Sequence, residues 1–314
     1  MPRPVHVFGA RDVHAAVNPA EAYDAVREAF VAYARGEWSM PPKVYVTNYP
    51  VGDFRAMPAI GGGHALLKWV TSFPGNPARG LPTVTGLVLL SDAEDGGLLA
   101  VFDAGAVTAL RTAAAAVLAA DTLARSDASS CAVVGCGVNG TETARMFLAR
   151  GRTPLVWDVD ERRREEVAER LGVVVAGSAA DAIACDVVAT VTPGHDVLYE
   201  PGSLRPGQHV SLMGADGPGK AEVAVEELHR ARLFCDDWEQ ASHGGELTGA
   251  FGAGVVTRAD VTDLGEVLIG DSVGRGTDDD VTLFDSTGLA IQDLAVAKAA
   301  YAKAGELDLP SLEL

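Results

Sequence analysis

The chain has 314 residues, which is long enough for two domains of ordinary size. Its 43 acidic and 25 basic side chains give a formal net charge of −18, and this field disfavours nucleic acid and anionic membrane surfaces as partners. The N-terminus lacks the apolar core of a signal peptide, and the four cysteines form no C-x-x-C pair, so we expect a cytoplasmic protein with reduced thiols.

The first third of the chain predicts one helix followed by a mostly antiparallel sheet. Asn18 as N-cap, Pro19 at the first helical position and Gly36 just past the end are typical of a helix. After Pro41 and Pro42, the short runs K-V-Y-V-T-N, A-L-L-K-W-V-T, T-V-T-G-L-V-L-L and L-L-A-V-F-D predict strands, because they are apolar or alternating and are separated by glycine-rich turns.

The remainder of the chain predicts a doubly wound parallel sheet. A long alanine-rich helix begins near residue 106, and apolar strands then alternate with helical segments at the spacing of βαβ units. The expected strands are 131–134, 154–157, 173–176, 187–190, 208–213 and 232–235. The run D-E-R-R-R-E-E-V-A-E-R at 160–170 predicts a solvated helix face, and the final segment L-A-I-Q-D-L-A-V-A-K-A-A-Y predicts an amphipathic helix that returns to the first domain.

A glycine loop follows the strand at 131–134. Gly135, Gly137 and Gly140 enclose Val138 and Asn139 and lead into a helical segment, which is the context of a dinucleotide-binding turn. Asp158 closes the next strand about 20 residues further on, where an acid accepts the ribose hydroxyls of NAD. The arginines at 162–164 leave NADP as the alternative, and a turn without nucleotide is the structural alternative.

Three charged residues stand in otherwise apolar or glycine-rich surroundings. Lys68 lies within a strand, where it is a substrate-binding cation, a general acid or base, or a lysine that reaches solvent at the sheet edge. Arg111 lies on the alanine-rich helix and fits either a substrate carboxylate or a structural ion pair. Asp216 follows a predicted strand in G-A-D-G-P-G-K and is either a proton acceptor for an ammonium group or the start of a turn.

Metal chemistry has little support in the sequence. The seven histidines are scattered, and no H-E-x-x-H occurs. Asp236, Asp237, His243 and Glu246 form the nearest cluster of oxygen and nitrogen ligands, but we expect no metal there. Cys136 lies inside the glycine loop, where we expect a small packed side chain and not a reactive thiol.

The chain resembles the ornithine cyclodeaminase/μ-crystallin family, and within it the archaeal-type alanine dehydrogenase branch. The stretches that carry the resemblance are L-K-W-V-T-S-F-P-G-N-P-A-R-G-L-P-T-V, A-L-R-T-A-A-A, V-V-G-C-G, G-A-D-G-P-G-K-A-E, D-D-W-E-Q-A-S-H-G-G-E and D-S-T-G-L-A-I-Q-D-L-A. They extend from about residue 38 to residue 300 and so cover most of the chain.

The resemblance implies an α/β fold of two domains. Residues 1–115, completed by a C-terminal helix at 288–314, would form an α+β substrate and dimerisation domain, and residues 116–287 would form a Rossmann NAD-binding domain. A homodimer through the N-terminal sheet is expected.

The resemblance also implies roles for single residues. Lys68 and Arg111 would hold the carboxylate of an amino acid, and Asp216 would act on its amine. The residues expected to hold the cofactor are Thr112, Gly135, Gly137, Val138, Asn139, Gly140, Asp158, Thr190, Lys220 and Ser286. Lys43 would also bind the substrate, and it stands after the paired prolines where cyclodeaminases carry an arginine. A lysine is a point charge and not a planar fork, which argues against a strict ornithine substrate.

The implied reaction is hydride transfer from a small L-amino acid to NAD through an imino acid, as in oxidative deamination by an alanine dehydrogenase. The alternatives are an ornithine cyclodeaminase, which makes proline and ammonia, and a ketimine or imino-acid reductase. A non-catalytic NAD(P)-binding protein is the remote alternative.

Overall fold

The computed structural model describes residues 4–194, 196–215, 217 and 219–313. The chain divides into two compact units. Unit 1 comprises Met1–Arg111 and Leu289–Leu314, and unit 2 comprises Thr112–Gly288. Unit 1 is therefore made from both ends of the chain, whereas unit 2 is one continuous segment.

Unit 1 contains a seven-stranded sheet in the order β15-β1-β6-β5-β4-β3-β2. All neighbouring strands are antiparallel except β1 and β6, so the prediction of a mostly antiparallel sheet is confirmed. The elements are β1 Val5–Phe8, α1 Ala10–Ala16, α2 Pro19–Ala34, β2 Val44–Asn48, β3 Gly52–Gly61, β4 His64–Ser72, η1 Asn76–Arg79, β5 Val84–Asp92, β6 Leu98–Asp103, α11 Ala290–Tyr301, η3 Ala304–Glu306 and β15 Ser311–Leu312.

The predicted caps of helix α2 form as expected. The Asn18 side chain accepts a hydrogen bond from the backbone N–H of Glu21, and the Glu21 carboxylate accepts one from the backbone N–H of Asn18. This reciprocal capping box satisfies two N–H groups at a helix start that otherwise have no intrahelical partner. The same Glu21 also forms an ion pair with Lys303, which ties the start of α2 to the last turn of the chain.

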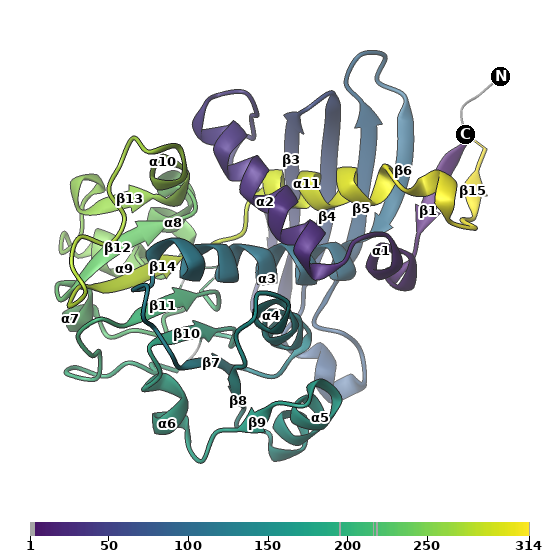
Figure 1. Cartoon of the computed structure of the whole chain (residues 1–314). Coiled ribbons are helices and arrows are strands. Elements are labelled where there is room, and N and C mark those ends of the chain that lie inside the picture. The colour runs from purple at the N-terminus through teal and green to yellow at the C-terminus, as the bar shows by residue number, and fades with distance from the viewer. Residues whose placement is uncertain (1–3, 195, 216, 218, 314) are drawn as a thin grey trace. The chain divides into compact units, whose positions relative to one another are not determined.

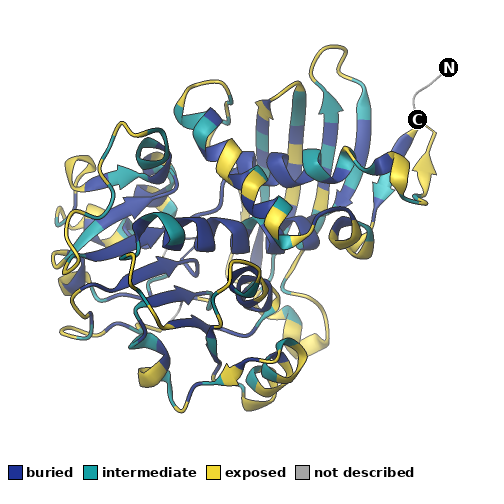
Figure 2. Cartoon of the chain, in the orientation of Figure 1, coloured by how far each residue is buried: buried dark blue, intermediate teal, exposed yellow. Residues whose placement is uncertain are grey.

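Helix α11 lies across the sheet of unit 1 and contacts β3, β4, β5 and α2 (Figure 1). The prediction that this helix is amphipathic is wrong. Residues on all its sides are buried, because the sheet lies against one side and α2 and α1 against others (Figure 2). Its buried residues include the polar Gln292 and Asp293, which the pattern of apolar residues does not explain.

The opposite face of this sheet carries exposed apolar side chains. Strand residues alternate between the two faces, and in β4 Leu66, Lys68 and Val70 are buried whereas Leu67 and Trp69 are exposed. We define the outer face by its exposed members, which are Val44, Val46, Ile60, Leu67, Trp69 and Leu87. Exposed positions run along β2 to β5, with β2 exposed at all five residues.

Unit 2 contains an eight-stranded parallel sheet in the order β13-β12-β14-β11-β10-β7-β8-β9. From β7 the chain first continues to β8 and β9 on one side and then crosses to β10 and β11 on the other. The strand order therefore reverses between β7 and β10, and such a switch point is where ligands of open α/β sheets bind.

The elements of unit 2 begin within helix α3, which starts in unit 1. They are α3 Ala104–Leu123, β7 Cys131–Val134, α4 Val138–Ala149, β8 Leu155–Trp157, α5 Glu161–Leu171, β9 Val174–Val175, α6 Ala179–Ile183, β10 Val187–Thr190, β11 His209–Leu212, α7 Val225–Leu228, β12 Ala231–Cys235, α8 Trp238–Gly244, α9 Thr248–Gly252, η2 Arg258–Asp260, β13 Val261–Asp263, α10 Leu264–Ile269 and β14 Val281–Asp285. The sequence analysis located β7 to β12 but missed β13 and the central strand β14.

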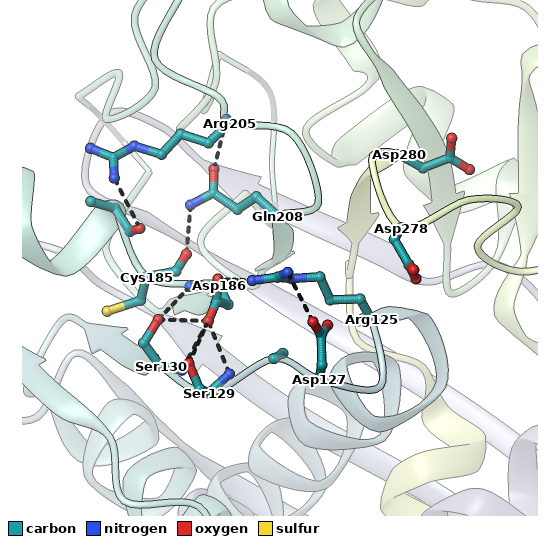
Figure 3. Close-up of polar contacts among 12 residues, drawn as sticks. Arg125, Asp127, Ser129, Ser130, Cys185, Asp186, Arg205, Gln208, Asp278 and Asp280 are labelled. Atoms are coloured by element: carbon teal, nitrogen blue, oxygen red, sulfur yellow. Dashed lines mark hydrogen bonds and ion pairs between the residues drawn. The ribbon is translucent and has the colours of Figure 1, made fainter.

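Asp186 joins the amino ends of the two strands at the switch point (Figure 3). Its carboxylate accepts hydrogen bonds from the backbone N–H groups of Ser129 and Ser130. It also forms an ion pair with Arg125 at 2.6 Å. Burial alone would raise the pKa of Asp186, but these donors hold it well below its usual range. Because Asp186 directly precedes β10 and Ser130 directly precedes β7, this cluster fixes the register of the two strands.

Among the described residues, α3 alone is long and apolar enough to cross a bilayer, and 83% of its apolar window is buried within the protein. Its alanines let neighbouring backbone approach closely. The hydroxyl of Ser211 in β11, for example, donates to the carbonyl oxygen of Ala116 at 2.9 Å.

Candidate functional site

The loop between β7 and α4 and the first turn of α4 contain three glycines with different surroundings. Gly135 has φ of +103°, a conformation that side chains rarely adopt. A Cβ on Gly140 would overlap the carbonyl oxygen of Gly135, so a residue with a side chain does not fit there. A Cβ on Gly137 would meet no described atom within 4 Å, so the space in front of this residue is open.

Gly137 is also the N-cap of helix α4, and it has no side chain to cap the helix. The first N–H groups of α4 and the positive end of its dipole therefore point to the open space beside Gly137. This geometry is the one in which helix N-termini bind phosphate groups.

Asp158 lies at the end of β8 and is directly connected to the glycine loop. One oxygen of its carboxylate accepts from the backbone N–H of Cys136 at 2.6 Å, and the other accepts from Asp160 at 2.8 Å. Burial and the neighbouring Asp158 charge raise the pKa of the Cys136 thiol to about 12. Cys136 is thus an inert, packed side chain, as the sequence analysis expected.

The three arginines of α5 each have an acidic partner. Arg162 pairs with Glu166 and Arg163 pairs with Asp160. Arg164 pairs with Glu161, donates to the carbonyl oxygen of Asp158 at 3.0 Å and lies over the Trp157 ring at 4.4 Å. Their charges are therefore partly compensated within the helix that carries them.

Two valines beside these polar groups are unusually exposed. Val138, the first residue of α4, is 75% exposed, and Val159, directly after Asp158, is 94% exposed. Exposed apolar side chains next to a phosphate-binding turn are suited to cover a purine base. Val138 belongs to the predicted cofactor residues, whereas Val159 does not.

Thr190 ends β10 and is linked to a buried carboxyl that the sequence analysis missed. The hydroxyls of Thr190 and Thr192 each donate to the carboxylate of Glu222 at 2.5 Å. The carboxyl of Glu246 in turn accepts from the backbone N–H groups of Glu222 and Val223. Glu222 thereby connects the end of β10 to the segment that follows β11, because Oε2, which accepts from Thr190, also accepts from the backbone N–H of Gly214.

Ser286 follows β14 and donates to the carboxylate of Asp236 at 3.1 Å. The acidic and histidine side chains of the cluster between 236 and 246 make contacts within the protein. Asp237 caps α8, and the His243 ring lies 2.9 Å from both the Ser242 hydroxyl and the Glu239 carbonyl oxygen. Among the described residues, no group of three or more histidine, cysteine or acidic side chains is arranged to hold a metal ion.

Four further residues of the predicted site are less well defined. Thr112 is buried, and its hydroxyl has no hydrogen-bond partner in the described part of the chain. Lys220 is partly buried, and its Cβ lies near Gly194. Lys43 is partly buried just before β2. Asp216 lies outside the described residues.

Lys68 of unit 1 is fully buried, so it does not reach solvent at the sheet edge. Its ammonium donates to the Asp293 carboxylate at 2.8 Å and to the Thr108 hydroxyl at 2.6 Å, and 1% of its surface is exposed. Burial lowers the Lys68 pKa to about 8; the Asp293 charge opposes this shift, whereas the Arg111 charge adds to it.

Arg111 lies beside the same carboxylate. Its Nε is 3.4 Å from Asp293 Oδ1, and its Nη1 donates to Gln292 Oε1 at 3.4 Å. Gln292 Oε1 also accepts from the backbone N–H of Leu289. The other end of this amide, Nε2, is a buried donor without a hydrogen-bond partner among the described residues. Lys68 and Arg111, predicted separately, are therefore brought to one carboxylate.

A third cation of unit 1 shares the sheet face with Lys68. Arg55 lies on β3, paired with Asp53 at 2.6 Å, and Met57, which directly opposes Lys68, is two residues away on the same face. The sequence analysis missed Arg55, Gln292 and Asp293. The last two were visible only as polar residues in the stretch A-I-Q-D of an otherwise apolar helix.

The reversed parallel sheet with its glycine loop and its acid at the end of the second strand defines the class: an α/β protein with a Rossmann-type unit. The ornithine cyclodeaminase/mu-crystallin family model matches residues 5–307. The chain belongs to this family.

Individual relatives are similar over nearly the whole chain. An alanine dehydrogenase of Archaeoglobus fulgidus is 44% identical over 95% of this chain and 94% of its own length. A solved archaeal alanine dehydrogenase dimer with bound NAD is 41% identical, with a TM-score of 0.93 over 99% of both chains. The Δ(1)-pyrroline-2-carboxylate reductase of Thermococcus litoralis, solved with NADH and L-proline, is 26% identical, with a TM-score of 0.91 over 99% of this chain and 100% of that one.

Proposed function

We propose that the protein is an NAD-dependent oxidoreductase that deaminates a small L-amino acid through an imino acid, as an alanine dehydrogenase does. The observation that carries this proposal is a pair of cations, the fully buried Lys68 and the largely buried Arg111, in a chain that also contains a glycine loop of the dinucleotide-binding type. Two cations beside one carboxylate leave an excess positive charge, and an amino-acid carboxylate would neutralise it.

The residues of unit 2 fit NAD. The open space at Gly137 and the uncapped start of α4 suit a pyrophosphate, whereas Gly135 and Gly140 permit the tight turn. Asp158 would accept the ribose hydroxyls, and its negative charge disfavours the 2′-phosphate of NADP. Val138, Asn139, Thr112, Thr190, Lys220 and Ser286 are proposed as further contacts. When bound, NAD supplies the acceptor for the hydride.

In the proposed reaction, Lys68 and Arg111 hold the substrate carboxylate and so fix the position of the α-carbon. Asp216 accepts a proton from the substrate ammonium, which makes the α-hydride transferable. Loss of the hydride leaves an imino acid, and attack by water then releases ammonia and a 2-oxo acid. The balance is one amino acid, one NAD⁺ and one water consumed for one 2-oxo acid, one ammonium ion, one NADH and one proton formed.

The test is to incubate the protein with NAD and single amino acids and to follow NADH by absorbance. We expect NADH to form with L-alanine or another small amino acid. Conversion of ornithine to proline without net NADH would identify a cyclodeaminase, and consumption of NADH with a cyclic imino acid would identify a reductase. If no amino acid or imine is converted and neither NAD nor NADP binds, the proposal is wrong.

Asp216 is tested by the isosteric variant Asp216→Asn. We expect kcat to fall by at least about 100-fold, since a general base contributes on the order of 100-fold to 10,000-fold. The dissociation constant of NADH, measured by fluorescence, should stay within twofold. Unchanged turnover would remove Asp216 from the mechanism.

A second copy of this chain is the proposed partner, bound through the outer face of the unit 1 sheet. Contiguous exposed apolar surface of this kind marks interaction sites, and the Phe54 and Trp69 rings stack at 5.8 Å within it. The solved archaeal alanine dehydrogenase is a dimer, which supports a second copy as the partner. The four free, buried cysteines fit the proposed cytoplasmic location.

A further inference from the structure

Three elements of unit 1 bring buried or largely buried polar side chains to one point. Strand β4 supplies Lys68, helix α3 supplies Thr108 and Arg111, and helix α11 supplies Asp293. Asp293 is 225 positions after Lys68 in the chain, and it is completely buried. A buried carboxylate in the middle of an apolar helix is costly unless it has partners.

The contacts of Asp293 are unequal. Its Oδ1 accepts the Lys68 ammonium at 2.8 Å and lies 3.4 Å from Arg111 Nε. Its Oδ2 has no hydrogen-bond partner among the described residues, and neither has Arg111 Nε. The arrangement is therefore incomplete as a purely structural ion pair, because buried hydrogen-bonding capacity remains unused on both charges.

The other neighbours of Lys68 do not replace the charge of Asp293. The Thr108 hydroxyl donates to the carbonyl oxygen of Ala104 at 2.6 Å, so it accepts from Lys68 and contributes no charge. Met57 on β3 and Val88 on β5 directly oppose Lys68 and are apolar.

The charges around Lys68 add to an excess of one positive charge. Arg55 is compensated by Asp53, with which it forms an ion pair at 2.6 Å. Lys68 and Arg111 share the single negative charge of Asp293. One anionic group from outside the protein would complete the balance.

We propose that Asp293 is a positioning residue, which holds Lys68 as a charged ammonium and aligns Lys68 and Arg111 as a pair toward the carboxylate of the substrate. The identity of that carboxylate rests on the proposed function, whereas the alignment rests on the contacts of Asp293. Removing the charge of Asp293 leaves Lys68 buried beside Arg111 and Arg55, whose charges both lower its pKa from the present value of about 8. The Lys68 pKa then falls below its present value, so Lys68 loses its proton at a lower pH than in the wild type.

The test compares Asp293→Asn and Asp293→Glu with the wild type, in the amino-acid oxidation that the wild type performs. We expect Asp293→Asn to raise KM at least tenfold while kcat changes by less than threefold, because the carboxylate contact is weakened. The wild-type KM should rise above about pH 8, as Lys68 loses its proton, and this rise should begin at least one pH unit lower in Asp293→Asn. Asp293→Glu keeps the charge and should retain the wild-type pH profile.

The matched control is Glu21→Gln, which removes the carboxylate of another ion pair of unit 1, with Lys303 at 2.6 Å, at a partly exposed position. It should leave KM and its pH dependence unchanged. A cycle with Lys68→Met gives a second test: because Asp293 acts through Lys68 as well as Arg111, the double variant Lys68→Met/Asp293→Asn should lose less kcat/KM than the two single variants added together.

The proposal is overturned if Asp293→Asn has the KM and the pH profile of the wild type. It is also overturned if the losses of kcat/KM in the two single variants add in the double variant. A measurement without turnover separates it from the proposed function: pyruvate binding by calorimetry in the presence of NADH. If the wild type oxidises no amino acid, the proposed function fails, but a tenfold loss of pyruvate affinity in Asp293→Asn still supports the alignment. Equal affinity, or no binding to the wild type, contradicts it. If Asp293→Asn does not fold, Asp293→Glu must keep the wild-type pH profile for the proposal to stand.

Discussion

Gly137 and Gly140 are three residues apart at the start of helix α4, yet a methyl group on each would act differently. At Gly140 the added atom meets the backbone of Gly135, so the folded protein itself is disturbed. At Gly137 it enters open space in front of helix α4, so only a ligand in that space is affected.

The pair Gly137→Ala and Gly140→Ala therefore separates binding from stability. We expect Gly140→Ala to lower the free energy of unfolding by about 1–3 kcal/mol, since a packed site must shift to accept the methyl group. Gly137→Ala should leave the melting temperature within about 2 °C of the wild type but weaken NADH binding at least tenfold. Thermal melting and NADH fluorescence titration measure the two effects, and unchanged NADH affinity in Gly137→Ala would place the pyrophosphate elsewhere.

Glu246 gives a second prediction for a single residue. Burial raises the pKa of Glu246 to about 8. The hydrogen bond from the backbone N–H of Glu222 opposes this shift, whereas the charge of the Glu222 carboxylate adds to it. Between pH 4.5 and about 8 the unfolded chain has lost this proton and the folded chain retains it, so the contribution of Glu246 to stability falls as the pH rises through this window. Glu246→Gln cannot ionise and keeps an acceptor oxygen for the same N–H groups.

We therefore expect Glu246→Gln to match the wild type in melting temperature at pH 5 and to exceed it by about 3 °C or more at pH 8. Calorimetric scans at the two pH values check this. A difference that is the same at both would show that ionisation of Glu246 has no part in it.

At the scale of elements, the amino ends of β7 and β10 depend on Asp186. Its carboxylate receives two backbone N–H groups and Arg125, and its depressed pKa stabilises the fold above about pH 4, an effect that is lost as the pH falls through the pKa of the folded state.

Asp186→Asn should lower the free energy of unfolding by about 2 kcal/mol at pH 7, because hydrogen bonds to a charged group are replaced by weaker ones. Its melting temperature should also depend less on pH below pH 5 than that of the wild type. Asp127→Asn is the matched control, since Asp127 is largely exposed and pairs with the same arginine at 3.4 Å. Equal effects of the two variants would contradict a special role for Asp186.

The elements that could be predicted are those with a local signature. The cap at Asn18, the glycine loop and strands β7 and β10 are encoded by residues adjacent in the chain, and the structure has them where expected. Strand β3 was missed because Arg55 and Pro58 interrupt its apolar pattern, and β14 because a run of aspartates precedes it like a turn.

The same distinction applies to the site. Lys68 and Arg111 are conspicuous because each is a charge within an apolar run. The residue that joins them, Asp293, has no local signature, because its partner lies 225 positions away and only the fold brings the two together. Glu222 was missed for the same reason, since its partners Thr190 and Thr192 lie on another strand and its loop.

At the scale of the whole molecule, the outer face of the unit 1 sheet predicts that two copies of the chain form a dimer. Trp69 and Leu87 directly oppose each other on β4 and β5, and both are exposed. A protein that leaves such a surface uncovered would expose a wide apolar patch to water.

We expect the wild type to be a dimer and Trp69→Glu/Leu87→Glu to be a monomer, because a charge in the centre of an apolar interface is left without a partner. Val273→Glu is the control, since Val273 is exposed outside this face. Light scattering after size-exclusion chromatography measures the mass. A wild type that is a monomer, or a double variant that remains a dimer, would rule out this face.

The division of unit 1 between the two ends of the chain has a consequence for synthesis on the ribosome. Unit 2 is complete once Gly288 has been translated. Lys68 in unit 1, however, has no Asp293 to pair with until helix α11 has also been translated. A message truncated after the glycine loop but before that helix therefore encodes a polypeptide that keeps the loop and leaves Lys68 and Arg111 without their counter-ion. Because Asp293 lies on this late helix, we expect such a truncated product to be inactive even where unit 2 has folded.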